Sequence, residues 1–172
     1  MKIPRLGECK FDDREGCYVS EPISLAVLNG EKCRILVQDY DEDPPVEDFN
    51  EAISNFLQAP YTVLAAAEPY IFRYYLDIKN SIEPEDDFPS IDSPSEIWPF
   101  IQLGADAYVS RRSDGDNGIY VWIECNCDWE PEHGLLIVFK NGAVVNKVGP
   151  FDGHFTNSDA YADSTLENVI YR

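Results

Sequence analysis

The sequence predicts an α+β fold: a mainly antiparallel sheet built from hairpins, with two or three helices packed on it. Three observations predict it. Two Asn-Gly pairs, at positions 29–30 and 141–142, each separate two apolar, β-prone runs, which is typical of a tight hairpin turn. Between them, residues 46–57 carry apolar side chains at helical spacing. From residue 106 onward, apolar and polar residues alternate with the period of a strand.

The first strands are expected at residues 16–20, 23–28 and 32–38. A helix is expected next, at residues 45–58, with Asp43 as its N-cap. Its apolar residues recur on one face, which must be buried against another layer: Val46, Phe49, Ile53, Phe56 and Leu57. This pattern predicts a helix that packs on the sheet.

Residues 61–80 combine strong helix formers with a proline at position 69. Because proline removes a backbone donor and clashes with the preceding turn, we expect two helical pieces or one kinked helix. The segment also carries an aromatic cluster, for which core packing is expected because aromatic side chains bury the most area: Tyr70, Phe72, Tyr74 and Tyr75.

The remaining elements follow a loop. Residues 81–96 hold six acids and three prolines without a base, which predicts a loop, and Ser93 is expected to cap a short helix. Four strands separated by short turns then predict an antiparallel meander: 106–112, 118–125, 133–140 and 143–148. We expect one compact domain with three segments: an N-terminal hairpin and helical region at 1–80, the acidic proline-rich loop at 81–96, and the meander at 97–172.

Composition excludes several classes of protein. The chain has 172 residues, is 44% hydrophobic and 13% aromatic, and can therefore fold around its own core. Its net charge of −19 argues against nucleic acid, whose phosphates require lysine and arginine, and against an anionic membrane surface. No segment resembles a signal peptide or a spanning helix, and the five cysteines do not form CxxC pairs. We expect a cytoplasmic protein with free thiols and, without a Walker loop or dinucleotide fingerprint, no cofactor.

Two C-terminal segments carry a resemblance to a known family. Residues 127–135 read CDWEPEHGL and residues 148–160 read VGPFDGHFTNSDA. They resemble the shared domain of a family of uncharacterised bacterial proteins, with a CDWE-x-EHGL segment, a hairpin, and a VG-x-x-DGH-x-TN-x-DA segment. The resemblance covers residues 97–172 and extends only loosely into the N-terminal half. It implies no established activity. Members often look like immunity-type proteins of bacterial toxin systems, or like proteins that neighbour the cargo of such systems.

Both histidines of the chain, His133 and His154, lie in these segments, on either side of a predicted hairpin that can bring them together. An enzyme would use Cys127 as nucleophile, a histidine as base and Asp152 to orient it. A metal site would combine the histidines with thiolate for zinc, or use carboxylates for calcium. Because neither an HExxH nor an EF-hand spacing is present, no bound metal is predicted.

The other interpretation of these segments is a structural clasp. Trp129 would plug the edge of the sheet, Gly134 and Gly153 would give backbone freedom, and the histidines would hydrogen-bond to turn backbone or a nearby carboxylate. Because Cys125 and Cys127 are two residues apart, they would share one face of a strand. The predicted structural motif comprises Asp128, Trp129, Glu130, Glu132, His133, Gly134, Asp152, Gly153, His154, Thr156, Asn157 and Asp159.

The acidic stretches indicate a partner. Residues 39–51 carry seven acids and residues 81–96 six, with no base in either, so they could steer a cationic surface, although acidity also serves solubility. We expect a small acidic binding protein, an immunity or antitoxin-like inhibitor of a basic protein partner. The alternative is a metal-dependent or Cys/His enzyme centred on His133 and His154. The residues predicted to bind the partner are Asp41, Glu42, Asp43, Glu47, Glu85, Asp86 and Asp87.

Overall fold

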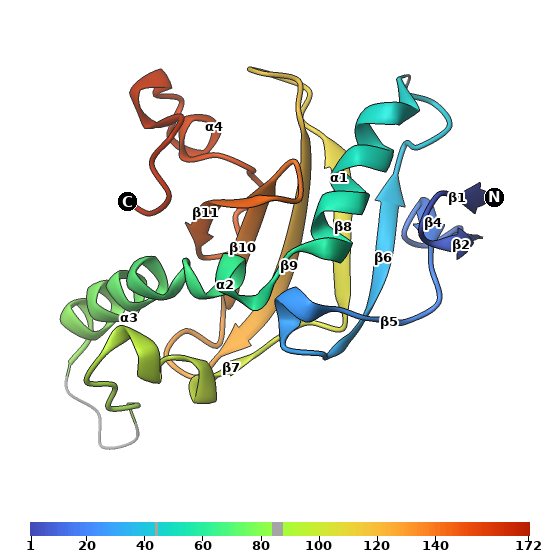
Figure 1. The fold of residues 1–172 in the computed structure, drawn as a ribbon. Coiled ribbons are helices and arrows are strands. Elements are labelled where there is room, and N and C mark those ends of the chain that lie inside the picture. Colours follow the sequence, from blue (N-terminus) through green and yellow to red (C-terminus); the bar gives the residue numbers. More distant parts are fainter. Residues whose placement is uncertain (44, 84–87) are drawn as a thin grey trace.

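A mixed sheet forms the central layer of the structure, a computed structural model that describes residues 1–43, 45–83 and 88–172. Within these residues the strands follow the order β11-β10-β9-β8-β6-β4-β3, with β5 beside β6 and β7 beside β9 (Figure 1). The strands are β1 (Lys2–Ile3), β2 (Gly7–Glu8), β3 (Lys10–Asp12), β4 (Cys17–Val19), β5 (Ile23–Ser24), β6 (Lys32–Gln38), β7 (Ile101–Gln102), β8 (Asp106–Arg111), β9 (Ile119–Cys127), β10 (Leu135–Lys140) and β11 (Val144–Gly149). The fold is α+β, as predicted.

The four strands predicted in the C-terminal half are confirmed as β8, β9, β10 and β11, which pair antiparallel in chain order. The parallel pairing of β6 with β8 was not predicted from the sequence. Parallel neighbours need a long crossover, and here the described part of the connection from residue 39 to residue 105 carries three α-helices. As a result, both halves of the chain contribute strands to one sheet.

The predicted strand at 23–28 is wrong beyond its first two residues. Only Ile23 and Ser24 pair with β6, and a 3₁₀ turn, η1 (Ala26–Leu28), follows. A half-buried strand would alternate between core and solvent, whereas Val27 and Leu28 are both buried. The turn after η1 keeps the predicted chemistry, since Asn29 and Gly30 have φ of 56° and 88°.

The helices predicted between residues 45 and 80 are present as α1 (Val46–Gln58), α2 (Tyr61–Ala65) and α3 (Glu68–Ser81), and the short helix expected after Ser93 is the 3₁₀ turn η2 (Pro94–Glu96), followed by η3 (Trp98–Phe100). Two further elements, α4 (Asn157–Tyr161) and the 3₁₀ turn η4 (Ser164–Leu166), follow the meander and were not predicted. The chain divides into two helical pieces near Pro69, which lies in the first turn of α3. Asp43 is not the N-cap of α1, because that position is Pro45 and the Asp43 carboxylate binds Arg111 instead. No helix in the described residues is long and apolar enough to cross a bilayer.

The two faces of the sheet carry different residues. On one face, called the helix face, paired positions from neighbouring strands are buried in the main core under α1–α3: Val37, Val109, Val121, Phe139 and Val145. The opposite face is called the strap face, because residues 150–156, the strap, contact it through Phe155. On this face, one series of residues that pair from each strand to the next runs across the sheet: Leu36, Tyr108, Trp122, Val138 and Lys147. Helices α1–α3 therefore cover one face, and the strap lies on the other.

Candidate functional site

The CDWE segment, residues 127–130, lies at the end of β9 and packs against α3. Trp129 is 3% exposed, and its ring meets those of Tyr74 and Tyr75 edge-on, with centroids 6.2 and 6.0 Å away. The Tyr74 hydroxyl donates to the Gly134 carbonyl at 3.1 Å, which fixes the far side of the same turn. The aromatic residues Tyr74 and Tyr75 of α3 thus serve core packing, as predicted, and Trp129 packs against them.

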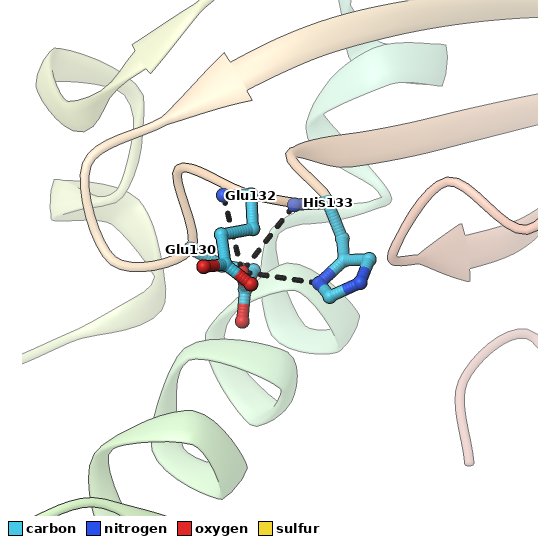
Figure 2. A group of neighbouring side chains, drawn as sticks. All are labelled: Glu130, Glu132 and His133. Atoms are coloured by element: carbon cyan, nitrogen blue, oxygen red, sulfur yellow. Dashed lines mark hydrogen bonds and ion pairs between the residues drawn. The ribbon is translucent and has the colours of Figure 1, made fainter.

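Glu130 organises the turn between β9 and β10, as Figure 2 shows. Its Oε1 accepts from the backbone N–H groups of Glu132 and His133, both at 3.3 Å, and lies 3.2 Å from His133 Nδ1. Potential ligand atoms of these three residues lie within 4.8 Å of one another. Since the Glu130 oxygen already serves the turn, its hydrogen bonds explain this cluster without an ion.

Cys127 is the last residue of β9. Its thiol is buried and donates to the Glu130 carbonyl at 3.7 Å, and Cys125 is buried on the same face of β9. Burial, aided by the charges of Glu130 and Asp128, raises the pKa of Cys127 to about 12. A thiol with so high a pKa holds almost no thiolate at neutral pH, so Cys127 is poorly suited to nucleophilic attack.

Asp152 is committed to a lysine. Lys147 Nζ is nearly inaccessible and donates to the two Asp152 oxygens at 2.5 and 2.6 Å and to the His154 carbonyl at 3.1 Å. Burial lowers the pKa of Lys147, with Asp152 opposing that shift. Asp152 also accepts from the His154 backbone N–H at 3.0 Å. These bonds anchor the strap to β11, and Gly153, with φ of 75°, makes the turn between them.

The last motif residues hold the C-terminal segment. Thr156 caps α4 by accepting from the Asp159 N–H, and Asn157 donates to the Val169 carbonyl at 2.7 Å. Asp159 pairs at 2.7 Å with Arg112, a buried arginine that also binds Glu167. Hydrogen bonding from Arg112 holds the pKa of Glu167 below its usual range. Each of these polar residues therefore has a structural partner.

A pocket of about 350 Å³ opens on the strap face. Strand residues form its floor, principally Tyr108 on β8 and Trp122 on β9, which are cross-strand neighbours with stacked rings 5.2 Å apart. The strap forms one wall through Phe151, Gly153, His154 and Phe155. Glu15, from the turn between β3 and β4, and Glu124 on β9 supply the carboxylates of the lining.

The lining of this pocket is negatively charged. Among the described residues that line it there is no lysine or arginine. Burial, reinforced by the negative charges of Glu124 and Glu15, raises the pKa of the Tyr108 phenol to about 12. Glu124 is held in place by the Trp122 indole, which donates to its Oε1 at 3.2 Å. The pocket therefore combines aromatic surface with carboxylates.

The two histidines lie in neighbouring hollows. His154 lines the pocket just described, whereas His133 lines a second hollow of about 530 Å³ that shares Phe151 and Glu124 with it. The backbone is joined here as well, since the Phe151 N–H donates to the His133 carbonyl at 3.1 Å. The hairpin thus brings the two segments together. In the described residues, no hydrogen bond links either histidine ring to Cys127 or Asp152.

The aromatic floor of the pocket was not predicted from the sequence. Tyr108 and Trp122 occur inside predicted strands, and Phe155 occurs inside the family-like motif, so each was assigned to the general fold. A signal was available: on strands whose other face is mainly aliphatic, large aromatic residues at alternate positions mark a face of different character.

The predicted partner-binding acids have mixed surroundings. Asp43 binds Arg111 Nε at 2.7 Å, and Asp41 accepts from the Tyr18 hydroxyl at 2.8 Å. Glu42 and Glu47 are exposed, and no ion pair is seen for either within the described ranges. Glu85, Asp86 and Asp87 lie outside the described residues.

Comparison with known proteins gives a family and no activity. No curated protein and no solved structure matches the chain. One family model matches residues 5–155, so the shared domain includes the N-terminal half that the motif resemblance covered only loosely, and it ends before Thr156. Both walls of the pocket, including Glu15 and the strap up to Phe155, fall inside that match. The chain belongs to the family described as a domain of unknown function, DUF6985.

Proposed function

We propose that the protein is a binding module that holds a basic protein partner, as an immunity or antitoxin-like inhibitor would. The observation that carries this proposal is the pocket on the strap face, whose described lining combines Glu15 and Glu124 with aromatic side chains and contains no lysine or arginine. Such a lining attracts positive charge and offers apolar contact to what lies around that charge.

The overall charge supports the same partner. A net charge of −19 on 172 residues gives a negative field that accelerates the approach of a cationic protein. Glu42 and Glu47 are exposed and can contribute to that field, whereas Asp43 is partly neutralised by Arg111. The acidic stretch at 39–51 would thus steer the partner, and the pocket would hold it.

The enzyme alternative has less support from the geometry. Its nucleophile would be Cys127, whose thiol is buried and bonded to the Glu130 carbonyl. Its orienting acid would be Asp152, which is paired with Lys147. Both side chains are thus committed to the fold, and a structural role fits them better than a catalytic one.

A capture experiment with matched variants tests the proposal. The wild-type chain would be immobilised beside a pocket variant, Glu15→Gln/Glu124→Gln, and a control, Glu8→Gln/Glu31→Gln, which removes two exposed acids outside the pocket lining. A retained protein would then be purified and its association rate measured at low and high salt. We expect a partner with an excess of lysine and arginine, held by wild type and control and lost from the pocket variant.

The salt dependence is the second part of the test. Between about 50 and 300 mM salt the association rate should fall by about tenfold or more, because screening removes the attraction between surface charges. A purified partner without a basic excess, an association rate that does not change with salt, or equal retention by the pocket variant would each contradict the proposal.

A further inference from the structure

The pocket on the strap face is lined by aromatic rings, which suit some cations better than others. Its floor is aromatic, since Tyr108 and Trp122 stack against each other, with ring centroids 5.2 Å apart and an interplanar angle of 14°. Its wall includes Phe155, whose ring centroid is 4.9 Å from that of Trp122. A planar cation that is only weakly hydrated gains more from such surfaces than a compact, strongly hydrated ammonium does.

The carboxylates are placed at two sides of this aromatic surface. Glu124 lies two residues beyond Trp122 on the same face of β9, and Glu15 reaches the pocket from the turn between β3 and β4. The Trp122 indole bonds to Glu124 Oε1, and in the described residues no hydrogen bond engages Oε2. A guanidinium presents several donors in one plane, which suits a carboxylate at the edge of a stacked surface.

The pocket is also held in shape before any ligand arrives. The strap is fixed by the bonds from Lys147 to Asp152 and to the His154 carbonyl, and by the Asn146 side chain, which donates to the Phe155 carbonyl at 3.0 Å. Phe155 stacks on Tyr120 at 5.3 Å, so the wall cannot swing away without losing that contact. A preformed site loses little conformational freedom on binding.

We propose that this pocket receives the side chain of one arginine of the protein partner, with the guanidinium against the aromatic floor and beside Glu124 and Glu15. The inference rests on the proposed function and deepens it, because it names the chemical group that the pocket recognises. The rest of the partner would lie over the rim, toward the neighbouring hollow that contains His133.

Short capped peptides provide a direct test. Three peptides would be compared that differ only at a central residue: arginine, lysine, or citrulline, which has the shape of arginine without its charge. Binding would be followed by NMR through the indole N–H signal of Trp122, assigned with a Trp122→Phe variant. The indoles of Trp98 and Trp129 serve as internal controls, since neither residue lines the pocket and Trp98 donates to Glu68.

We expect the arginine peptide to shift the Trp122 signal with a Kd of about 1–10 mM, the range for a single side chain. Lysine should bind about fivefold more weakly and citrulline about tenfold or more. Glu124→Gln should weaken arginine binding by about tenfold, while Glu31→Gln should leave it unchanged. Free L-arginine should bind no better than the peptide, since the proposed ligand is a protein side chain.

The inference and the proposed function can fail separately. If the arginine peptide leaves the Trp122 signal unmoved, or if citrulline or lysine binds as well, the arginine assignment is wrong even where a basic partner still requires Glu15 and Glu124. If free L-arginine binds much more tightly than the peptide, the pocket serves a small molecule and not a protein partner. If the arginine peptide binds selectively but the captured protein is not basic, the proposed function is wrong and the chemistry of the pocket stands.

Discussion

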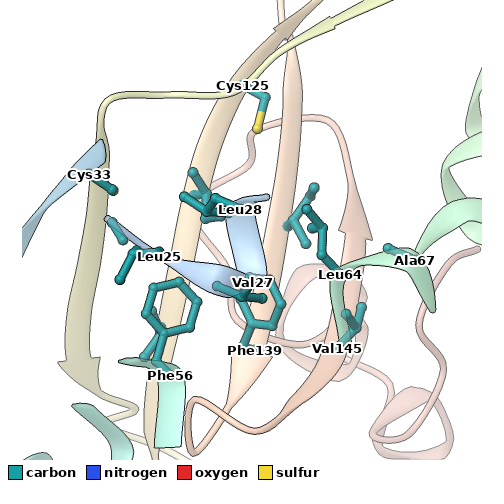
Figure 3. Packing of buried hydrophobic residues seen from close by; sticks show 14 of the residues in the cluster. Leu25, Val27, Leu28, Cys33, Phe56, Leu64, Ala67, Cys125, Phe139 and Val145 are labelled. Atoms are coloured by element: carbon teal, nitrogen blue, oxygen red, sulfur yellow. The ribbon is translucent and has the colours of Figure 1, made fainter. Parts of the chain in front are cut away.

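The two faces of the sheet use the same strands for different purposes. On the helix face the paired residues Val109, Val121 and Phe139 are fully buried, and Phe56 of α1 lies against Phe139 with the 3₁₀ turn η1 beside it (Figure 3). On the strap face the alternate residues of those strands include Tyr108 and Trp122, which line an open pocket together with residues of the strap. The helix face therefore supplies most of the hydrophobic stability, which leaves the strap face free to carry a pocket.

Replacing a phenylalanine by alanine should therefore reduce stability much more on the helix face than on the strap face, and this is the largest difference that we expect. Phe56 is 1% exposed, and Phe56→Ala should lower the free energy of unfolding by about 4 kcal/mol, because it leaves a cavity between α1 and β10. Phe151, in the wall of the pocket, is 48% exposed, and Phe151→Ala should cost less than about 1 kcal/mol. Urea unfolding of both variants measures the contrast, and equal losses would show that the strap face is as important to stability as the helix face.

The strap face has one strong anchor of its own. Asp152→Asn should destabilise the protein by about 3 kcal/mol, because it leaves the buried ammonium of Lys147 without its counterion. Lys147→Met in the same chain should restore much of that loss, since no charge then remains buried. Chemical denaturation of the two single variants and the double variant gives the coupling between these residues. Purely additive losses would mean that the pair does not hold the strap.

Much of the fold could be predicted because its signals are local. The helix at Val46–Gln58 and the meander follow from side-chain periods, and the turn at Asn141-Gly142 follows from backbone chemistry. The parallel pairing of β6 with β8 could not be predicted, since it depends on how a crossover of more than sixty residues packs, and no short pattern encodes that. The 3₁₀ turn at Ala26–Leu28 was missed for a related reason, because tertiary burial overrode strand propensity.

The candidate site shows the same limit. The CDWE and DGH segments were correctly singled out as neighbours, yet the sequence favoured their histidines and acids, which the structure shows bonded within turns. The pocket instead depends on Tyr108, Trp122 and Glu15, which come from three separate parts of the chain. Only the register of β8 against β9 and the course of the strap bring them together. The residues chosen for their chemistry thus include Gly153 and His154 of the pocket wall but not its aromatic floor.

The C-terminal segment beyond the family match should show a pH dependence. Hydrogen bonding from Arg112 lowers the pKa of Glu167 in the folded protein, so the unfolded state binds a proton more readily. The contribution is fully present above the unfolded pKa, near 4.5, and is lost as pH falls through the folded value. Glu167→Gln should cost about 2 kcal/mol at neutral pH, since Arg112 keeps Asp159 and Asp116 as partners. Denaturation from pH 7 to about pH 3 should show the two proteins converging as the acid is protonated; a constant difference would contradict the role of this pair.

The smallest effects are expected in the turn that contains His133. Glu130→Ala removes the acceptor for two backbone N–H groups and should cost about 1 kcal/mol, a typical value for a lost side-chain cap. His133→Ala should cost only about 0.5 kcal/mol, because the ring is 60% exposed and makes one hydrogen bond to Glu130. Neither variant should change the zinc content of the purified protein, which elemental analysis would measure. Zinc at about one ion per chain in the wild type, lost in both variants, would instead show that Glu130, Glu132 and His133 hold a metal and that their arrangement is more than a turn.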